Sequence, residues 1–191
     1  MKYPWFAKLR PEHAIEQGDI FYNVPAIEPI SADIDRGESI TANVIKQDVI
    51  IMTQSCDLGH GKVNNVTVCP VTNFQQHILN NFDSVGKRKG HAKKLKRGED
   101  LRYHLLNEEP GIVDELYVVD LKNVFGVSYE LLEKLKINQT ERVRLLPPYR
   151  EHLSQAFARV YMRIGLPIDI SEEELMKKAT NTRYNVITPS S

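Results

Sequence analysis

Reactive and polar side chains follow directly on an apolar run in the stretch DVIIMTQSCDLGH, which covers residues 48–60. The run ends in Gln54, Ser55, Cys56, Asp57 and, three residues on, His60. Cys56 would need a base and a lowered pKa to act as a nucleophile, and His60 is the only nearby histidine. The alternative is a thiol packed as a small hydrophobic group, beside polar neighbours that bond to the backbone of the following turn. We expect the packed thiol, with Gln54, Ser55 and Asp57 holding the strand end and any ligand.

A metal half-site is a further interpretation of Cys56, Asp57 and His60. Zinc sites usually combine two pairs of ligands, and the sequence has neither a second Cys pair nor a His-x-x-x-His motif. We therefore predict no metal and no cofactor. The other cysteine, Cys69, falls several residues from Cys56 along the expected hairpin ladder, so we predict two free thiols and no disulfide.

A basic run, GKRKGHAKKLKRGE, is the second candidate for chemistry. Its charged members include Lys87, Arg88, Lys93, Lys94, Lys96 and Arg97. Clustered Lys and Arg side chains bind nucleic-acid phosphates through counterion release. The run contains no aromatic residue to stack on bases, so it indicates contact without sequence preference. The alternative is a solvated, mobile loop.

A helix is predicted after Pro148, ending near residue 164, and two stripes of residues follow its period. The apolar stripe, with i, i+3, i+4, i+7 and i+11 spacing, is Leu153, Ala156, Phe157, Val160 and Ile164. The polar stripe is Tyr149, His152, Gln155, Arg159 and Arg163. Such a polar stripe either lines a cleft that binds an anion or an acidic partner, or is the hydrated edge of an amphipathic helix.

Composition limits the classes of function. The chain of 191 residues has 25 basic and 25 acidic side chains, so no general attraction to nucleic acid or membranes is predicted. No apolar run approaches the roughly 20 residues of a membrane span. The opening MKYPWFAKLRPEH does not have the pattern of a signal peptide. We expect a cytoplasmic protein without membrane contact.

Short strands are the main elements that would position these residues. Strands are predicted near 18–24, 48–55, 65–71, 101–106 and 115–121, where β-branched and aromatic residues are bounded by turn residues. Besides the helix after Pro148, helices are predicted at 73–82, at 129–136 with Ser128 as cap, and after a capping box at 171–174. The apolar run before Gln54 predicts a strand buried on both faces.

Four of these segments resemble one known family. QGDIFYNVP, DVIIMTQS, NVTVCPVT and DELYVVDLKNVFGVSYELLEKL resemble the MazF/PemK-like toxins, which are small SH3-like barrels that cleave RNA. The resemblance spans about residues 17–136. It implies a MazF/PemK-like SH3-like β-barrel domain, which we place at 1–146 within a mixed β and α fold. The resemblance does not explain residues 1–16, the basic helical insertion at about 73–98 or the C-terminal helical extension at 147–191.

The resemblance also implies candidate site residues. Family members carry an Arg, usually followed by Pro, before the Val-rich strand, and here that slot is Gln47-Asp48. Thr72 matches the family's Ser or Thr on the next strand. If the protein cleaves RNA, Thr72 and Ser55 would contact phosphate, and Asp57 or His60 would transfer protons. Arg102 or Arg159 would then supply the missing cation.

Two hypotheses about function follow. The first is a bacterial protein of a toxin–antitoxin or phage-defence system that binds RNA and, if it is an enzyme, cleaves it as an endoribonuclease. The second is a non-catalytic protein–protein interaction module on the same barrel. The partners that they imply are RNA, a protein such as an antitoxin, and a second copy of the chain in a homodimer.

Overall fold

The computed structural model describes residues 3–28, 43–59, 63–139, 141–162 and 176. The chain divides into two compact units, Met1–Tyr161 and Met162–Ser191. The strands and helices below lie in the first unit, which includes the predicted helix after Pro148. In the described ranges, no helix is both long and apolar enough to cross a membrane.

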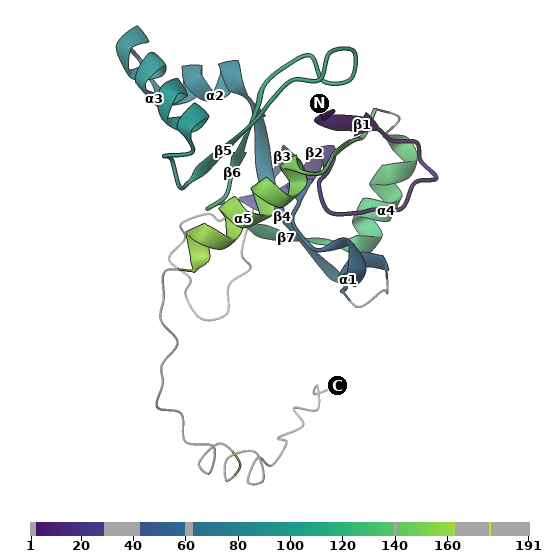
Figure 1. The fold of residues 1–191 in the computed structure, drawn as a ribbon. Helices are drawn as coiled ribbons and strands as arrows, with labels where there is room; N and C mark the ends of the chain where they lie inside the picture. Colours follow the sequence, from purple (N-terminus) through teal and green to yellow (C-terminus); the bar gives the residue numbers. More distant parts are fainter. Residues whose placement is uncertain (1–2, 29–42, 60–62, 140, 163–175, 177–191) are drawn as a thin grey trace. The chain divides into compact units, whose positions relative to one another are not determined.

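An antiparallel sheet is the framework of this unit (Figure 1). The described residues contribute eight strands: β1 (Phe6–Lys8), β2 (Asp19–Glu28), β3 (Asn43–Ile51), β4 (Asn65–Asn73), β5 (Tyr103–Leu106), β6 (Tyr117–Asp120), β7 (Phe125–Ser128) and β8 (Val143–Leu145). Their order is β1-β8-β2-β3-β4-β6-β5, with β7 paired to β4. All five predicted strands are present, so the mixed β and α class is confirmed, but the described strands do not close into a barrel.

Strand β4 organises the sheet because it changes partner along its length. Its first half pairs with β7, its middle with β3, and Val71 to Asn73 with β6. Pro70, opposite Val49 in the ladder, lies where the partner changes from β3 to β6. A proline has no N–H to donate, and the change of partner accommodates it there. The strand predicted at 65–71 therefore runs through Pro70 and ends at Asn73.

Two apolar cores cover the two faces of the sheet. Alternating residues of β3 show this directly, because Ile50 packs into one core while Val49 and Ile51 pack into the other. All three are fully buried, which confirms the prediction of a strand covered on both sides.

Five helices lie in the described residues: α1 (Ser55–Gly59), α2 (Phe74–Asn81), α3 (Val85–Arg97), α4 (Tyr129–Asn138) and α5 (Tyr149–Tyr161). Ser128 caps α4 as predicted, by accepting a hydrogen bond from the Leu131 N–H at 3.4 Å. The apolar stripe of α5 packs on the first core as predicted, with Leu153 buried. Ile164, Arg163 and the capping box at 171–174 lie outside the described residues.

The basic run forms helix α3, so its interpretation as a mobile loop is wrong. Ser84 caps its first turn, and Gly98 ends it in the left-handed conformation at φ 64°. His91 and Leu95, spaced i and i+4, are the residues that it buries. Ser84 and Gly98 are sequence signals that would have indicated this helix.

Strands β2 and β8 are joined by a buried charge cluster. Asp19 is fully buried, and its carboxylate accepts a hydrogen bond from Arg144 Nε at 2.5 Å. Arg142, also buried, places Nη1 3.4 Å from the same carboxylate. Burial raises the pKa of Asp19, and the hydrogen bond and charge of Arg144 oppose that rise. The cluster fixes β8 against β2 at the Asp19–Arg144 pair of the ladder.

Candidate functional site

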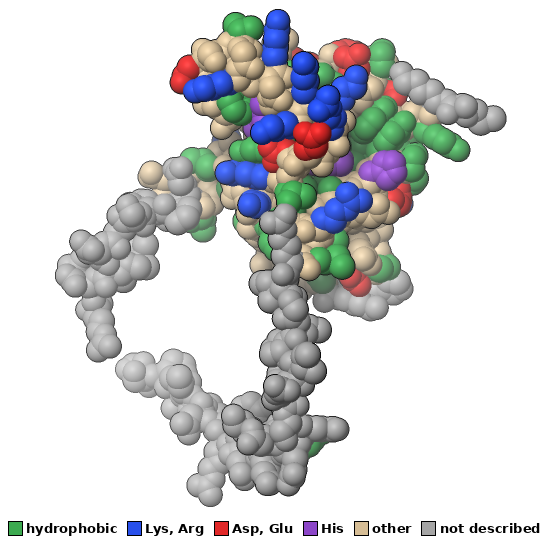
Figure 2. Space-filling model, turned by 60° about the vertical axis from the view of Figure 1, so that its left-hand side comes forward, with side chains coloured by type: hydrophobic (Ala, Val, Ile, Leu, Met, Phe, Trp, Pro, Cys, Tyr) green, Lys and Arg blue, Asp and Glu red, His purple; other side chains and the backbone are tan. Residues whose placement is uncertain are grey.

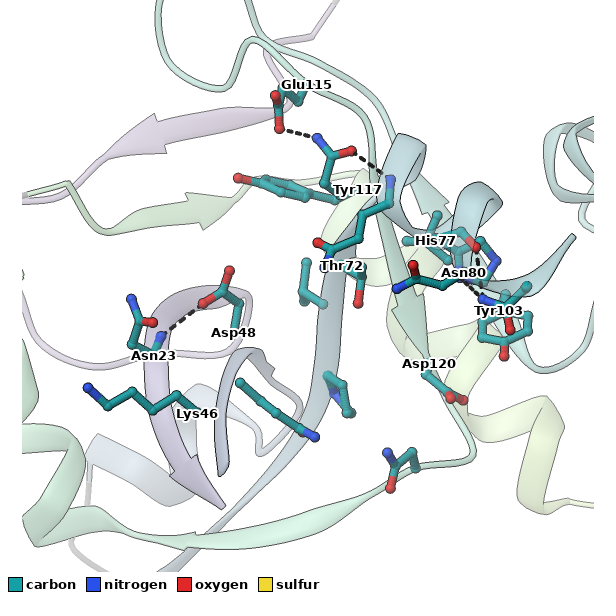
Figure 3. A pocket seen from close by; sticks show the side chains of 18 residues that line it. Asn23, Lys46, Asp48, Thr72, His77, Asn80, Tyr103, Glu115, Tyr117 and Asp120 are labelled. Atoms are coloured by element: carbon teal, nitrogen blue, oxygen red, sulfur yellow. Dashed lines mark hydrogen bonds between the residues drawn. The ribbon is translucent and has the colours of Figure 1, made fainter. Parts of the chain in front are cut away.

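A polar cavity of about 530 Å³ lies among β3, the end of β4, α2 and β6 (Figure 3). Its wall includes the Gln47-Asp48 slot and Thr72, which lies opposite Val118 in the sheet. The sequence resemblance singled out these positions separately, and the fold brings them to one cavity. We call this the first cavity.

Side-chain amides dominate the first cavity. They are Asn23, Gln47, Asn73, Gln76, Asn80, Asn81 and Asn123. Three carboxylates and two tyrosines, Asp48, Glu115, Asp120, Tyr103 and Tyr117, complete most of the polar wall. Among the described residues that line it, Lys46 is the only lysine or arginine. The lining therefore suits an uncharged part of a ligand that carries many hydrogen-bonding groups.

The carboxylates of this cavity already have partners. Asp48 Oδ1 accepts a hydrogen bond from the Asn23 N–H at 2.8 Å. Asn23 lies at a bulge in β2 with φ 53°, a conformation that asparagine tolerates better than most residues. Glu115 accepts a hydrogen bond from Asn73 Nδ2. Asp48 and Glu115 thus hold backbone and side chains in place.

Arg102 is held by Asp120 beside the first cavity. Its Nε and Nη2 donate to the Asp120 carboxylate at 3.1 and 2.8 Å, and its guanidinium lies 4.9 Å from the centre of the Tyr103 ring. Of this pair, Asp120 lines the cavity. The structure thus does not bring the Arg102 guanidinium to Thr72 as a replacement cation.

Two buried histidines, His77 on α2 and His91 on α3, link the two helices. The Nε2 atoms of His77 and His91 are 3.0 Å apart, and Asp100 lies 3.7 Å from His91 Nδ1. Burial lowers the pKa of both histidines, so they are neutral at pH 7. Sequence analysis missed this pair, whose only signal was the i, i+4 spacing of His91 and Leu95.

Gln54, Ser55 and Asp57 lie on or beside α1, away from the lining of the first cavity. Ser55 Oγ accepts a hydrogen bond from the Gln17 N–H at 3.2 Å, and Asp57 lies in the first turn of the helix. Gln54 Oε1 is 3.7 Å from the Cys56 sulfur. His60 lies outside the described residues. Of the three proposed catalytic residues that the structure describes, Thr72 alone lines the first cavity.

The prediction that Cys56 is a packed thiol is wrong, because Cys56 is exposed. The chain turns into α1 at Ser55, so Cys56 lies on a helix and not at the end of the buried strand. The buried thiol is Cys69, opposite Ile50 in the ladder. Burial raises the pKa of Cys69 to about 12. Cys56 and Cys69 form no disulfide with each other, as predicted.

A second cavity of about 580 Å³ lies among α3, β5 and α5. It brings the end of the basic run, Lys96 and Arg97, to the predicted polar stripe of α5, represented by Tyr149, His152, Gln155 and Arg159. The stripe therefore lines a cleft. Lys87, Arg88, Lys93 and Lys94 lie on α3 outside this lining. We call this the second cavity.

Comparison with known proteins adds no family. No protein-family model matches the chain, and no curated protein matches it. The resemblance to the MazF/PemK-like toxins thus stays a prediction.

Proposed function

We propose that this protein binds single-stranded RNA through the first cavity. The observation that carries this proposal is the meeting of the Gln47-Asp48 slot and Thr72 in an amide-rich cavity. Unpaired RNA bases present donors and acceptors on their edges, and carboxamides offer both kinds of group in return. The Tyr103 and Tyr117 rings lie in the same wall, and Lys46 supplies a cation for a phosphate.

We also propose that the sheet is an open, divergent form of the SH3-like barrel of the MazF/PemK-like proteins. The change of partner along β4 supports this, because it directs the two halves of the strand into different pairings. The resemblance and the cavity then refer to the same surface of the fold.

Binding without cleavage is the expected activity. Cleavage needs a base for the 2′-hydroxyl and a cation for the charge that develops on phosphorus. Asp48 is the carboxylate of the Gln47-Asp48 slot, and it accepts a hydrogen bond from the Asn23 backbone N–H. Arg102 is committed to Asp120. We expect purified protein to leave mixed RNA intact, with or without a metal chelator.

Fluorescence anisotropy with a labelled single-stranded RNA tests the binding. Gln76 lines the first cavity, whereas its neighbour Gln75, also exposed on α2, does not. Loss of one hydrogen bond costs about 0.5–1.5 kcal/mol, so Gln76→Ala should weaken binding about two- to tenfold. Gln75→Ala is the matched control and should bind as the unchanged protein does.

Equal affinities for the two variants would mean that RNA binds elsewhere. Absence of RNA binding by the unchanged protein would reject the proposal in favour of the interaction-module hypothesis. A chelator-resistant cleavage product would instead contradict the expectation of binding without cleavage.

A further inference from the structure

The second cavity is built mostly from segments that the family resemblance does not cover. Trp5 comes from the N-terminal segment, Lys96 from the basic helix and Arg159 from α5. The rest of the lining, from β5 and the residues beside it and from Leu121, lies within the span of the resemblance. Its chemistry is therefore a property of this chain.

The lining of this cavity has more positive than negative side chains: Lys96, Arg97 and Arg159 against one carboxylate, Asp100. Arg97 has an exposed partner, Glu99, at 3.5 Å, but Lys96 and Arg159 form no ion pair with any residue that the structure describes. The one carboxylate in the lining, Asp100, accepts the N–H groups of Arg102 and Tyr103 at 2.9 and 3.2 Å. Figure 2 shows Lys and Arg side chains gathered over the upper part of one face, with histidines near them.

His104 reports the same excess of positive charge. Burial, together with the charges of His152 and Arg159, lowers the pKa of His104 to about 4. Like charges that face one another cost free energy unless something offsets the cost. A bound anion would offset that cost.

An aromatic platform lies in the same lining. The Trp5 and Tyr149 rings stack with centroids 3.5 Å apart and planes 6° from parallel. The ring of His152 meets Tyr149 edge-on at 6.3 Å. Base stacking on such rings contributes about 1–3 kcal/mol per base. The basic run alone lacked an aromatic residue, and the fold supplies one from each end of the first unit.

We propose that the second cavity binds a phosphate group together with the unpaired base of the same nucleotide. Lys96, Arg97 and Arg159 bind the phosphate, and the Trp5–Tyr149 pair stacks on the base. A free nucleotide and a single strand of RNA share this chemistry. Tyr103 lines both cavities, so one strand can reach from the second cavity to the first. For single-stranded RNA as the ligand, this inference rests on the proposed function.

Trp5 fluorescence tests the proposal, since Trp5 is the only tryptophan in the sequence. The full chain is titrated with uridine, inorganic phosphate, uridine monophosphate and a single-stranded oligouridylate. We expect the monophosphate to change the emission at lower concentration than either uridine or phosphate. An oligouridylate that binds at least tenfold tighter identifies the strand as the ligand, and equal binding identifies the free nucleotide.

Two lysines on α3 give matched variants. Lys96 lines the second cavity and Lys93 does not, although both are exposed and both changes remove one positive charge. Lys96→Gln should weaken uridine monophosphate binding about fivefold, the upper value for an exposed ion pair. Lys93→Gln should bind within twofold of the unchanged protein.

The failures of the two proposals are distinguishable. RNA binding that depends on Gln76 and leaves Trp5 emission unchanged overturns this inference and retains the proposed function. A change of Trp5 emission on addition of the monophosphate, without RNA binding, retains this inference and overturns the proposed function. Equal binding of phosphate and monophosphate removes the role of the aromatic pair, and equal loss in the two lysine variants removes the role of the cavity.

Discussion

Lowering the pH from 7 to 5 tests the environment of His104. The groups that face it come from α5, as His152 and Arg159, and from α3 and the turn after it, as Lys96, Arg97 and Asp100. Burial and the nearby positive charges lower the pKa of His104 to about 4, against an ordinary value of 6.5. At pH 5 the unfolded chain therefore binds a proton at this histidine and the folded protein does not.

The direction in which stability changes with pH follows from this difference in proton binding. Stability is complete above pH 6.5 and falls as the pH drops toward 4, because protonation favours the unfolded state. Between pH 7 and pH 5 the loss from His104 alone is about 2 kcal/mol, and it levels off at about 3 kcal/mol below pH 4. His77 and His91 shift in the same direction, so the unchanged protein loses more than this.

The assay isolates His104 by difference. Urea unfolding at both pH values is compared for the unchanged protein and for His104→Gln, which stays neutral. The unchanged protein should lose about 2 kcal/mol more than the variant. Arg159→Gln removes a cation and should raise the pKa of His104, which reduces the difference. Saturating uridine monophosphate should also reduce it, since a bound phosphate favours the charged imidazole.

One result would refute this reasoning. If nuclear magnetic resonance shows His104 titrating near 6.5, or if both proteins lose equal stability, then neither burial nor the cations of the second cavity act on this histidine.

Two further predictions concern the rest of the fold. Asp19→Asn leaves Arg142 and Arg144 without a buried counter-charge and should cost about 3–5 kcal/mol in urea unfolding. Glu130→Gln breaks an exposed i,i+4 pair and should leave the unfolding midpoint nearly unchanged. Similar losses in the two variants would show that the buried cluster is solvated. A thiol reagent should modify Cys56 in the native protein and both cysteines only after unfolding, because Cys69 is buried with a raised pKa; two fast native thiols would contradict the assigned burial.

Local sequence patterns determined the elements whose residues lie close together in the chain. The β-branched run through Val49 and Ile51 predicted a strand buried on both faces, and Ser128 predicted the start of α4. The apolar stripe through Leu153 and Phe157 predicted the packed face of α5. These predictions hold because strand alternation, capping and helical periodicity depend on neighbours within a few residues.

Some predictions from local sequence patterns were wrong. The pattern after Ile51 favoured a continued strand with a buried thiol, yet the chain turns into α1 at Ser55 and exposes Cys56. The basic composition of residues 87–97 favoured a loop, although Ser84 and Gly98 cap a helix there. Strands β1, β7 and β8, each of three or four residues, were not predicted.

The tertiary structure alone decided the two cavities. Thr72 meets the Gln47-Asp48 slot because β4 lies between β3 and β6, and that order depends on pairings between distant strands. Trp5 reaches Tyr149 because β1 pairs with β8 immediately before α5. Sheet register and helix docking minimise the exposed apolar area of the whole unit, so the residues that share a cavity cannot be identified from spacing along the chain.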